Sequence, residues 1–293
     1  MNWTADHTHR NVTRVIVNAA TNSTWEQWVL LRTDVHHDNP KCRQDLEKKH
    51  LEQAKERNAI VIDNGDLFCA MQGKYDKRSN KDSVRPEHQT GKYLDALVNT
   101  AADFYEPYAH LFAVLGKGNH ETAICGRHET DLTDRLAASL RERTKCNVLS
   151  GGYGGWVKFV FKFGKSQFRA SKLLYHYHGT GGGGPVTRGV IQTNRMAVFN
   201  PDPDIIFTGH THDEWIVPIQ RQRVSDLGIP YQDEQLHLRA PGYKDAWGDG
   251  CDGWEVEKML GPKPVGSMWL RFTQECATKH TRQRVVIEAT RAK

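Results

Sequence analysis

The chain has 293 residues, a hydrophobic content of 38% and a formal net charge of +5. This length can hold one large α/β domain or two small ones, and it is sufficient to bury a sizeable core. No apolar run approaches the roughly 20 residues that a membrane-spanning helix needs, and the first residues lack the basic and apolar segments of a secretory signal. We therefore predict a cytoplasmic protein with no membrane partner, whose positive charge favours anionic ligands.

The cysteines are scattered along the chain without a C-x-x-C pair. Together with the missing secretory signal, this spacing indicates reduced thiols rather than a disulfide framework or a zinc knuckle. The sequence does not indicate the oligomeric state.

Short apolar runs and amphipathic spacing predict strands and helices that alternate along most of the chain. Strands, several with polar residues at their ends, are expected at residues 14–18, 25–31, 59–66, 111–115, 156–163, 172–179 and 204–212. Helices are expected at residues 41–58, 92–105 and 131–145. Later strands, expected to be antiparallel, lie at residues 215–219, 236–239, 267–272 and 284–287, and the Gly- and Trp-rich stretch 240–264 carries no prediction. The absence of repeats and linkers favours a single domain over residues 1–293.

The stretch from residue 111 to residue 121 runs from an apolar segment directly into polar, chemically capable side chains. Gly116 and Gly118 let the backbone turn, which places Asn119, His120 and Glu121 at the carboxyl end of the strand. Ligand sites gather at that edge of an open α/β sheet. One such stretch alone is more typical of a polar loop that happens to contain a histidine.

Four other strand ends repeat this design of apolar strand, turn and hard ligands. They are Asp34-x-His36, Gly65-Asp66, His178 before Gly179, and Gly209-His210-x-His212. Asp34 and His36 are two residues apart, so on an extended segment they would point the same way. Five strand ends of this kind in order predict a metal site.

The order D-x-H, G-D, G-N-H-[DE], H and G-H-x-H resembles the signature of calcineurin-like metallophosphoesterases, over about residues 30–213. The resemblance implies an α/β fold, a four-layer αββα sandwich in which two mixed β-sheets lie face to face between helices. The strands of residues 214–293 would complete the second sheet. The strand ends would meet at a dinuclear metal centre.

The resemblance also implies a role for each motif residue. Asp34, His36 and His212 would hold one metal, Asn119, His178 and His210 the other, and Asp66 would bridge both. His120 would be the general acid. Glu121 would orient His120 or, equally, support a ligand. His176 competes with His178 for the ligand role, and we choose His178 because it directly precedes Gly179.

The chemistry of the residues is consistent with these roles. A bridging carboxylate holds two cations about 3.5–4 Å apart, and a water between them becomes a hydroxide that can attack phosphorus. The leaving group then needs a proton from a residue that is not a ligand, and His120 has a suitable pKa range. The mixed nitrogen and oxygen ligands predict two divalent ions, Mn²⁺ first, with Fe, Zn or Ni as alternatives. His37 is expected to point away from the site, as a structural residue or a substrate contact.

The resemblance implies a phosphoester substrate, and the motifs narrow the expected class of ester. Protein Ser/Thr phosphatases carry arginines in G-D-x-x-D-R-G and R-G-N-H-E, which this chain lacks, and the residues 65–68, Gly-Asp-Leu-Phe, resemble the nuclease branch. The basic segment 74–85 is either a solvated loop or a grip on a polyanion. We predict a phosphodiesterase acting on nucleic acid or nucleotides. The alternatives are a small-molecule phosphomonoesterase or cyclic-nucleotide phosphodiesterase, and a non-catalytic metal-binding module, which the complete motif set disfavours.

Overall fold

The structure is a computed structural model that describes residues 1–20, 24–71, 83–164, 169–182, 187, 189–251, 254–275 and 284–292. Residues 74–82 of the basic segment and Cys276 lie outside these ranges. The five cysteines within them, Cys42, Cys69, Cys125, Cys146 and Cys251, are all free thiols, as expected.

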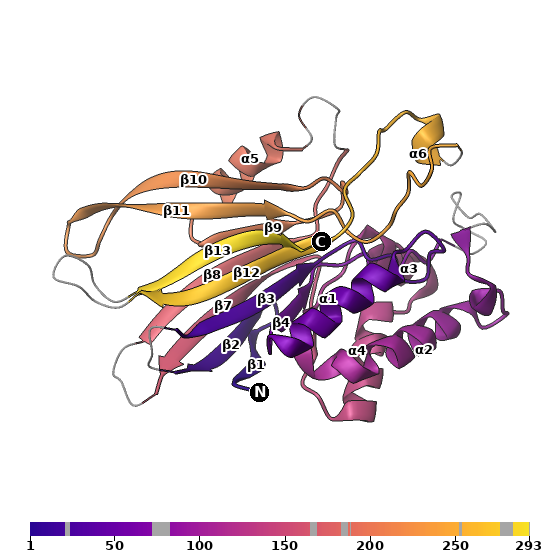
Figure 1. The fold of residues 1–293 in the computed structure, drawn as a ribbon, viewed down its shortest axis with the longest axis horizontal. Coiled ribbons are helices and arrows are strands. Elements are labelled where there is room, and N and C mark those ends of the chain that lie inside the picture. Colours follow the sequence, from indigo (N-terminus) through magenta and orange to yellow (C-terminus); the bar gives the residue numbers. More distant parts are fainter. Residues whose placement is uncertain are drawn as a thin grey trace.

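Two mixed sheets form the centre of the molecule (Figure 1). In the described residues one sheet has seven strands, in the spatial order β1 (Trp3–His9), β2 (Val12–Ala19), β7 (Gly154–Phe163), β8 (Arg169–Tyr177), β9 (Ile205–Thr208), β11 (Pro230–Arg239) and β10 (Trp215–Val224). The other has six, in the order β13 (Arg284–Ala292), β12 (Ser267–Glu275), β3 (Glu26–Arg32), β4 (Ile60–Asp63), β5 (Phe112–Leu115) and β6 (Leu149–Ser150). Parallel and antiparallel pairs occur in both sheets.

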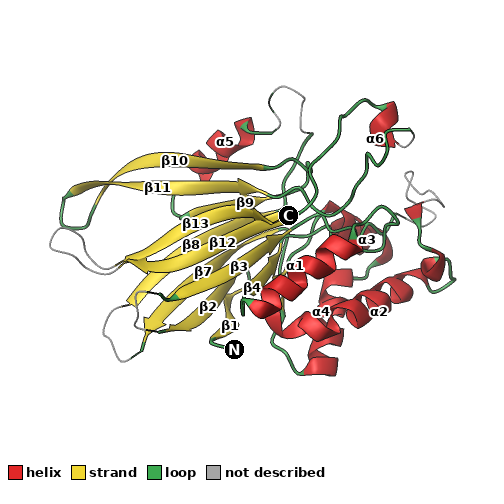
Figure 2. Ribbon diagram, viewed as in Figure 1, coloured by secondary structure: helices red, strands yellow, loops and turns green. Residues whose placement is uncertain are grey.

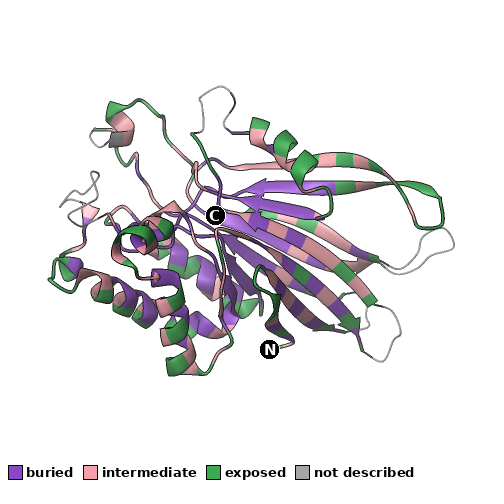
Figure 3. Cartoon of the chain, turned by 180° about the vertical axis from the view of Figure 1, so that it is seen from behind, coloured by how far each residue is buried: buried purple, intermediate pink, exposed green. Residues whose placement is uncertain are grey.

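Alternate side chains of the strands fill the space between the sheets. In β7, Phe159, Phe161 and Phe163 are buried, whereas the alternating residues Lys158 and Lys162 are exposed. The phenylalanines pack in one cluster with apolar residues of β3, β4 and β12 from the facing sheet. Figure 3 shows the same alternation as bands of buried and exposed residues along the long strands. Burial of each such side chain contributes about 1.5–3 kcal/mol, so this cluster holds the two sheets together.

Helices cover the outer faces of the two sheets unequally (Figure 2). The six-stranded sheet packs in a second apolar cluster with α1 (Gln44–Glu56), α2 (Tyr93–Tyr105), α3 (Asn119–His128) and α4 (Leu132–Thr144). Across β8 of the seven-stranded sheet lies the short helix α5 (Ile191–Phe199). In the part of the chain that the structure describes, the remaining helices are α6 (Trp254–Glu257) and the 3₁₀ helices Pro86–His88 and Glu106–Leu111. The predicted sandwich of two mixed sheets flanked by helices is confirmed.

The C-terminal strands differ from the expectation in one respect. We expected all of them to complete the second sheet, but β10 and β11 extend the seven-stranded sheet while β12 and β13 extend the six-stranded one. β12 pairs with β3, so the apolar side chains of both strands reach the interior together. No helix in the described ranges combines the length and the apolar character that a membrane crossing requires.

Candidate metal centre

The five predicted strand ends meet at one edge of the sandwich. β3, β4 and β5 are parallel neighbours in one sheet, and β8 and β9 are parallel neighbours in the other. Their carboxyl ends therefore lie side by side, and hydrogen bonds connect the loops that follow. Asp34 N donates to Gly65 O at 2.9 Å, and Gly209 N donates to His178 O at 2.8 Å. His210 N from the seven-stranded sheet donates to Asp34 Oδ2 at 2.7 Å and so joins the two halves of the site.

Asp34, His36 and His212 form the first group of candidate ligands, since one ligand atom from each lies within 4.8 Å of the others. Asp34 Oδ2 accepts hydrogen bonds from Thr33 Oγ1 and from His210 N, both at 2.7 Å. These donors fix the carboxylate and leave Asp34 Oδ1 without a hydrogen bond among the described residues. The group therefore presents a free carboxylate oxygen and two imidazoles to one point.

Asp66, His178 and His210 form the second group, again within 4.8 Å of one another. Asp66 Oδ1 accepts a hydrogen bond from His120 N at 2.9 Å, and Asp66 Oδ2 lies 3.1 Å from His178 Nε2. His178 Nδ1 pairs with the carbonyl oxygen of Asn64 at 3.0 Å. This contact directs Nε2 toward the site, as supporting contacts of metal-ligating histidines usually do.

His176 lies in a different environment from His178. Its Nδ1 pairs with Asn64 Oδ1 at 2.9 Å, it belongs to none of the ligand groups found in the described part of the chain, and burial lowers its pKa to about 4. Only His178 of the two lies against the carboxylate of Asp66.

Several buried polar atoms at this edge have no hydrogen-bond partner in the described chain. Four of them are Asp34 Oδ1, His36 Nδ1, Asn119 Oδ1 and His210 Nδ1, and a further atom, His178 Nε2, has only its 3.1 Å ion-pair contact with Asp66 Oδ2. Leaving a buried polar group unpaired costs about 1–3 kcal/mol, so four at one place require a compensating partner. A pair of divalent cations would supply it, because these oxygen and nitrogen atoms are the donors such ions take. The residues present therefore fit a dinuclear centre.

The charges at the site are consistent with cation binding. Burial alone would raise the pKa of Asp66, but His178 and His120 lower it well below its usual range. Burial likewise opposes protonation of His178, yet Asp66 and Asp34 raise the pKa of His178 to about 10. The two carboxylates thus attract positive charge to the place where His178 now pairs with Asp66, and a metal ion can take the place of the proton.

The backbone at the candidate ligands adopts the left-handed conformation that non-glycine residues rarely take. Five of the seven candidates have positive φ, namely Asp34 (49°), His36 (50°), Asp66 (51°), His210 (74°) and His212 (54°). The expectation that Asp34 and His36 share a face of an extended segment is therefore wrong, because β3 ends at Arg32. They converge through tight loops instead. Such strain is typical of functional sites.

Two glycines at the site are required for space. A Cβ at Gly65 would lie 2.2 Å from the backbone nitrogen of Gly118, and a Cβ at Gly118 would lie 2.0 Å from Asp66 Oδ1. The loops after β4 and β5 could not approach each other with larger residues. We attributed Gly118 to a turn, but its φ is −106°, which any residue can adopt, so its role is to let Asp66 lie against the start of α3.

His120 lies in the first turn of α3, beside the second ligand group. Its Nδ1 donates to the carbonyl oxygen of Cys69, and its Nε2 lies 3.9 Å from Asp66 Oδ2. The side chain is 11% exposed, so it can reach a substrate at the mouth of the site. Cys69, which sequence reasoning treated only as a scattered thiol, lies within 4.8 Å of His36 and His120 through its sulfur.

Glu121 supports the loop that carries Asp66. Its two carboxylate oxygens accept hydrogen bonds from the backbone nitrogens of Asp66 at 3.0 Å, Phe68 at 2.9 Å and Gly118 at 2.8 Å. Within the described ranges, no hydrogen bond joins the Glu121 carboxylate to the His120 ring. Of the two roles left open by the sequence, these contacts favour the second, and we propose Glu121 as a residue that positions the loop of Asp66.

A second buried polar cluster lies directly beneath the site, and its core escaped sequence reasoning. The fully buried Arg32 donates from Nε to Asp63 Oδ2 at 3.1 Å and from Nη2 to Glu47 Oε1 and the Tyr105 hydroxyl, both at 3.0 Å. His37 Nδ1 lies 3.0 Å from Glu47 Oε2. His37 is therefore structural, the first of its two expected roles. An arginine at the end of an apolar strand was the available signal.

The sequence profile described as "Calcineurin-like phosphoesterase" matches residues 28–214 of the chain. No curated protein matches it significantly. Remote similarity to solved structures extends over most of the chain.

A Streptococcus pneumoniae protein described as a predicted phosphoesterase is 10% identical, with a TM-score of 0.32 over 90% of this chain and 98% of its own. A Thermotoga maritima protein is 13% identical, with a TM-score of 0.29 over 90% and 99% of the two chains. A Plasmodium protein described as the anchor in the inner membrane complex is 10% identical, with a TM-score of 0.42 over 92% of this chain and 85% of its own.

Proposed function

Because the chain belongs to the calcineurin-like phosphoesterase family and is therefore a phosphoester hydrolase, we propose that it is a phosphodiesterase acting on nucleic acid or nucleotides. The observation that carries the proposal is the pair of ligand groups with four unpaired buried atoms at one sheet edge. A binding module would not need two such groups next to a histidine that remains free to move a proton. We propose Mn²⁺ as the native metal and the cytoplasm as the location, the latter supported by the free cysteines of the described chain.

The candidate ligands divide between the two metals as their contacts suggest. Asp34, His36 and His212 would hold the first, and Asn119, His178 and His210 would hold the second, with Asp66 available to both. When bound, the ions would neutralise phosphoryl oxygens and lower the pKa of the attacking water. The protein contributes orientation, because Thr33 and the backbone of His210 fix Asp34, while the backbone of His120 fixes Asp66.

His120 moves the proton that the leaving group requires. The carbonyl of Cys69 binds Nδ1 of the ring, so Nε2 faces the site and carries the proton to be donated. An alkoxide leaves about 10²–10⁴-fold faster when a positioned acid protonates it. After the bond between phosphorus and the leaving oxygen breaks, His120 is neutral and regains its proton from solvent through its exposed edge.

The surroundings of Asp66 support a diester rather than a protein phosphomonoester. Cys69 and Ala70 occupy the two positions at which protein Ser/Thr phosphatases carry aspartate and arginine, and both are buried. No guanidinium can therefore bind a terminal phosphate from this loop. Of the basic segment, Arg85 donates to the carbonyl of Asn39 at 3.0 Å and so has a structural partner.

Hydrolysis of bis-p-nitrophenyl phosphate and p-nitrophenyl phosphate by the Mn²⁺-loaded protein, alongside metal analysis, tests the proposal. We expect two metals per chain and a higher kcat/KM for the diester. A preference for the monoester would replace the diesterase with a phosphomonoesterase. No turnover of either ester with both metals bound would refute the proposal. Cleavage of a plasmid or an oligonucleotide then separates a nuclease from a nucleotide hydrolase.

A further inference from the structure

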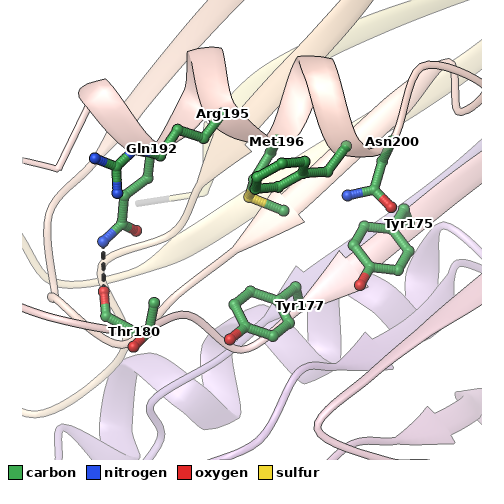
Figure 4. A pocket seen from close by; sticks show the side chains of 8 residues that line it. Tyr175, Tyr177, Thr180, Gln192, Arg195, Met196 and Asn200 are labelled. Atoms are coloured by element: carbon green, nitrogen blue, oxygen red, sulfur yellow. Dashed lines mark hydrogen bonds between the residues drawn. The ribbon is translucent and has the colours of Figure 1, made fainter.

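A pocket of about 450 Å³ opens between β8 and α5 (Figure 4). This volume lies within the range of small-molecule sites. The rings of Tyr175 and Tyr177 from β8 form one wall, and Met196 and Arg195 from α5 form the facing wall. Asn200 lies beside Tyr175 at one end. The pocket thus combines flat apolar surfaces with a cation and an amide.

The pocket begins at the metal-bearing edge of the sandwich. Tyr177 directly precedes His178, so one wall is continuous with a candidate ligand. β8 and β9 are parallel, and α5 connects them. The helix therefore starts at the edge where β8 ends and runs back along the sheet.

A hydrogen-bonded chain joins the pocket to the loop that carries His210 and His212. Gln192, in the first turn of α5, donates to the carbonyl of Thr180 at 2.6 Å and accepts from Arg239 Nη2 at 3.2 Å. Arg239 Nη1 donates to Thr211 Oγ1 at 2.7 Å, and Thr211 stands between the two histidines. The pocket wall and the metal loop are thus held in a fixed relation.

The tyrosine wall is flanked by further aromatic rings. Tyr177 packs against Tyr153 at a centroid distance of 5.4 Å, and Tyr175 packs against Trp156 at 4.7 Å. The helix does not close over this wall, because only Thr193 of α5 is buried while Val198 and Phe199 are about three-quarters exposed. A rigid aromatic platform is therefore left open to a flat ligand.

We propose that this pocket binds the nucleobase of a nucleotide whose phosphoester lies at the metal centre, an inference that rests on the proposed function. A base stacks on the tyrosine rings and against the thioether of Met196. Aromatic stacking suits any base because every base has a π-face. Asn200 offers a donor and an acceptor to the edge of the base, and the exposed Arg195 attracts a phosphate. In this arrangement the metal centre binds the phosphoester group, and the pocket provides the preference for a substrate that carries a nucleobase.

The test compares two diesters with the same leaving group, the p-nitrophenyl ester of thymidine 5′-monophosphate and methyl p-nitrophenyl phosphate, hydrolysed by the full-length Mn²⁺-loaded protein. We expect kcat/KM to favour the thymidine ester by about tenfold or more, the range of one stacked base. Tyr175→Ala and Met196→Ala should remove most of this preference through KM. Val198→Ala, an exposed position on the same helix that does not line the pocket, should retain it.

Two further results separate this proposal from the proposed function. Equal hydrolysis of both esters by the wild type would overturn the pocket while leaving the hydrolase intact. If neither ester reacts, the proposed diesterase activity is refuted, and the pocket is tested separately by calorimetric binding of AMP and ribose 5-phosphate. AMP should then bind at least tenfold more tightly, and equal affinities would overturn the proposal. If Tyr175→Ala does not fold, as judged by its Tm, Met196→Ala carries the comparison.

Discussion

Two buried polar clusters meet at the end of β3, and they differ in how many of their polar atoms have hydrogen-bond partners. The Arg32 cluster pairs one guanidinium with Glu47, Asp63 and Tyr105, and its remaining nitrogen, Nη1, lies among aromatic rings without a hydrogen-bond partner in the described chain. The ring centroids of Tyr105 and Phe112 are 5.1 and 5.2 Å from the guanidinium carbon. The ligand cluster, two residues further along, leaves four atoms unpaired.

The difference supports the proposal that the Arg32 cluster is structural and the ligand cluster binds metal. Buried polar groups are normally paired, so the Arg32 cluster has the ordinary form of a buried ion-pair network that fixes β3, β4 and α1. The ligand cluster is incomplete without cations, and its backbone is held in unfavourable conformations. Stable surroundings are needed to hold such strain, and the fully paired carboxylates of the Arg32 cluster directly below can provide them.

Replacing His120 should break catalysis without changing either cluster. For a dinucleoside monophosphate, whose leaving group is an alkoxide, His120→Ala should lower kcat by about 10²–10⁴-fold. The loss should be much smaller with p-nitrophenyl esters, because p-nitrophenolate leaves without a proton. Metal content and Tm should be unchanged. His128→Ala, the same change at the far end of α3, is the control and should keep full activity. Equal losses with both leaving groups would contradict a general-acid role.

The fold was largely predictable because most of its strands and helices have a clear apolar pattern in the sequence. Buried runs such as residues 111–115 and the leucines of α4 at positions 132, 136 and 140 follow the periods of a strand and a helix. β1 was missed, because its sequence Trp-Thr-Ala-Asp-His-Thr-His is mostly polar at an exposed sheet edge. α5 was missed as well, since only Thr193 of its residues is buried and no apolar stripe marks it.

The candidate site was predictable in its residue types and not in its geometry. Hard ligands at five strand ends, most of them next to a glycine, signalled a metal site, and the structure brings the Asp and His residues among them together. The left-handed conformations of Asp34 and His36 have no sequence signal, because non-glycine residues adopt them only when tertiary contacts require it. The role of Glu121 also depended on long-range contacts, since Phe68 and Asp66 are more than fifty positions away.

Removing the charge of Arg32 tests how much the Arg32 cluster contributes to the free energy of unfolding. Arg32→Met leaves Glu47 and Asp63 buried without their cation, and breaking such a network costs about 3–5 kcal/mol of unfolding free energy. Urea denaturation measures this value. The matched control is Arg14→Met, which breaks the surface pair with Asp6, with side chains 42% and 49% exposed, and should cost less than about 1 kcal/mol. Similar costs for the two variants would show that the buried cluster is not what supports the strained loops.

Metal binding at the ligand cluster should stabilise the folded protein by less than the Arg32 cluster does, and by an amount that depends on the free metal concentration. A ligand that binds only the folded state stabilises it by about 2.7 kcal/mol at a free concentration 100 times its Kd, which is roughly 4 °C in Tm for a chain of this size. We expect Mn²⁺ to raise the Tm of the wild type relative to protein in chelator, and Asp66→Asn to lose most of this rise. Arg14→Met should show the full rise, since its surface ion pair with Asp6 includes no candidate ligand. An unchanged rise in Asp66→Asn would mean that the cations bind elsewhere, because a neutral amide cannot bridge them as the carboxylate of Asp66 does.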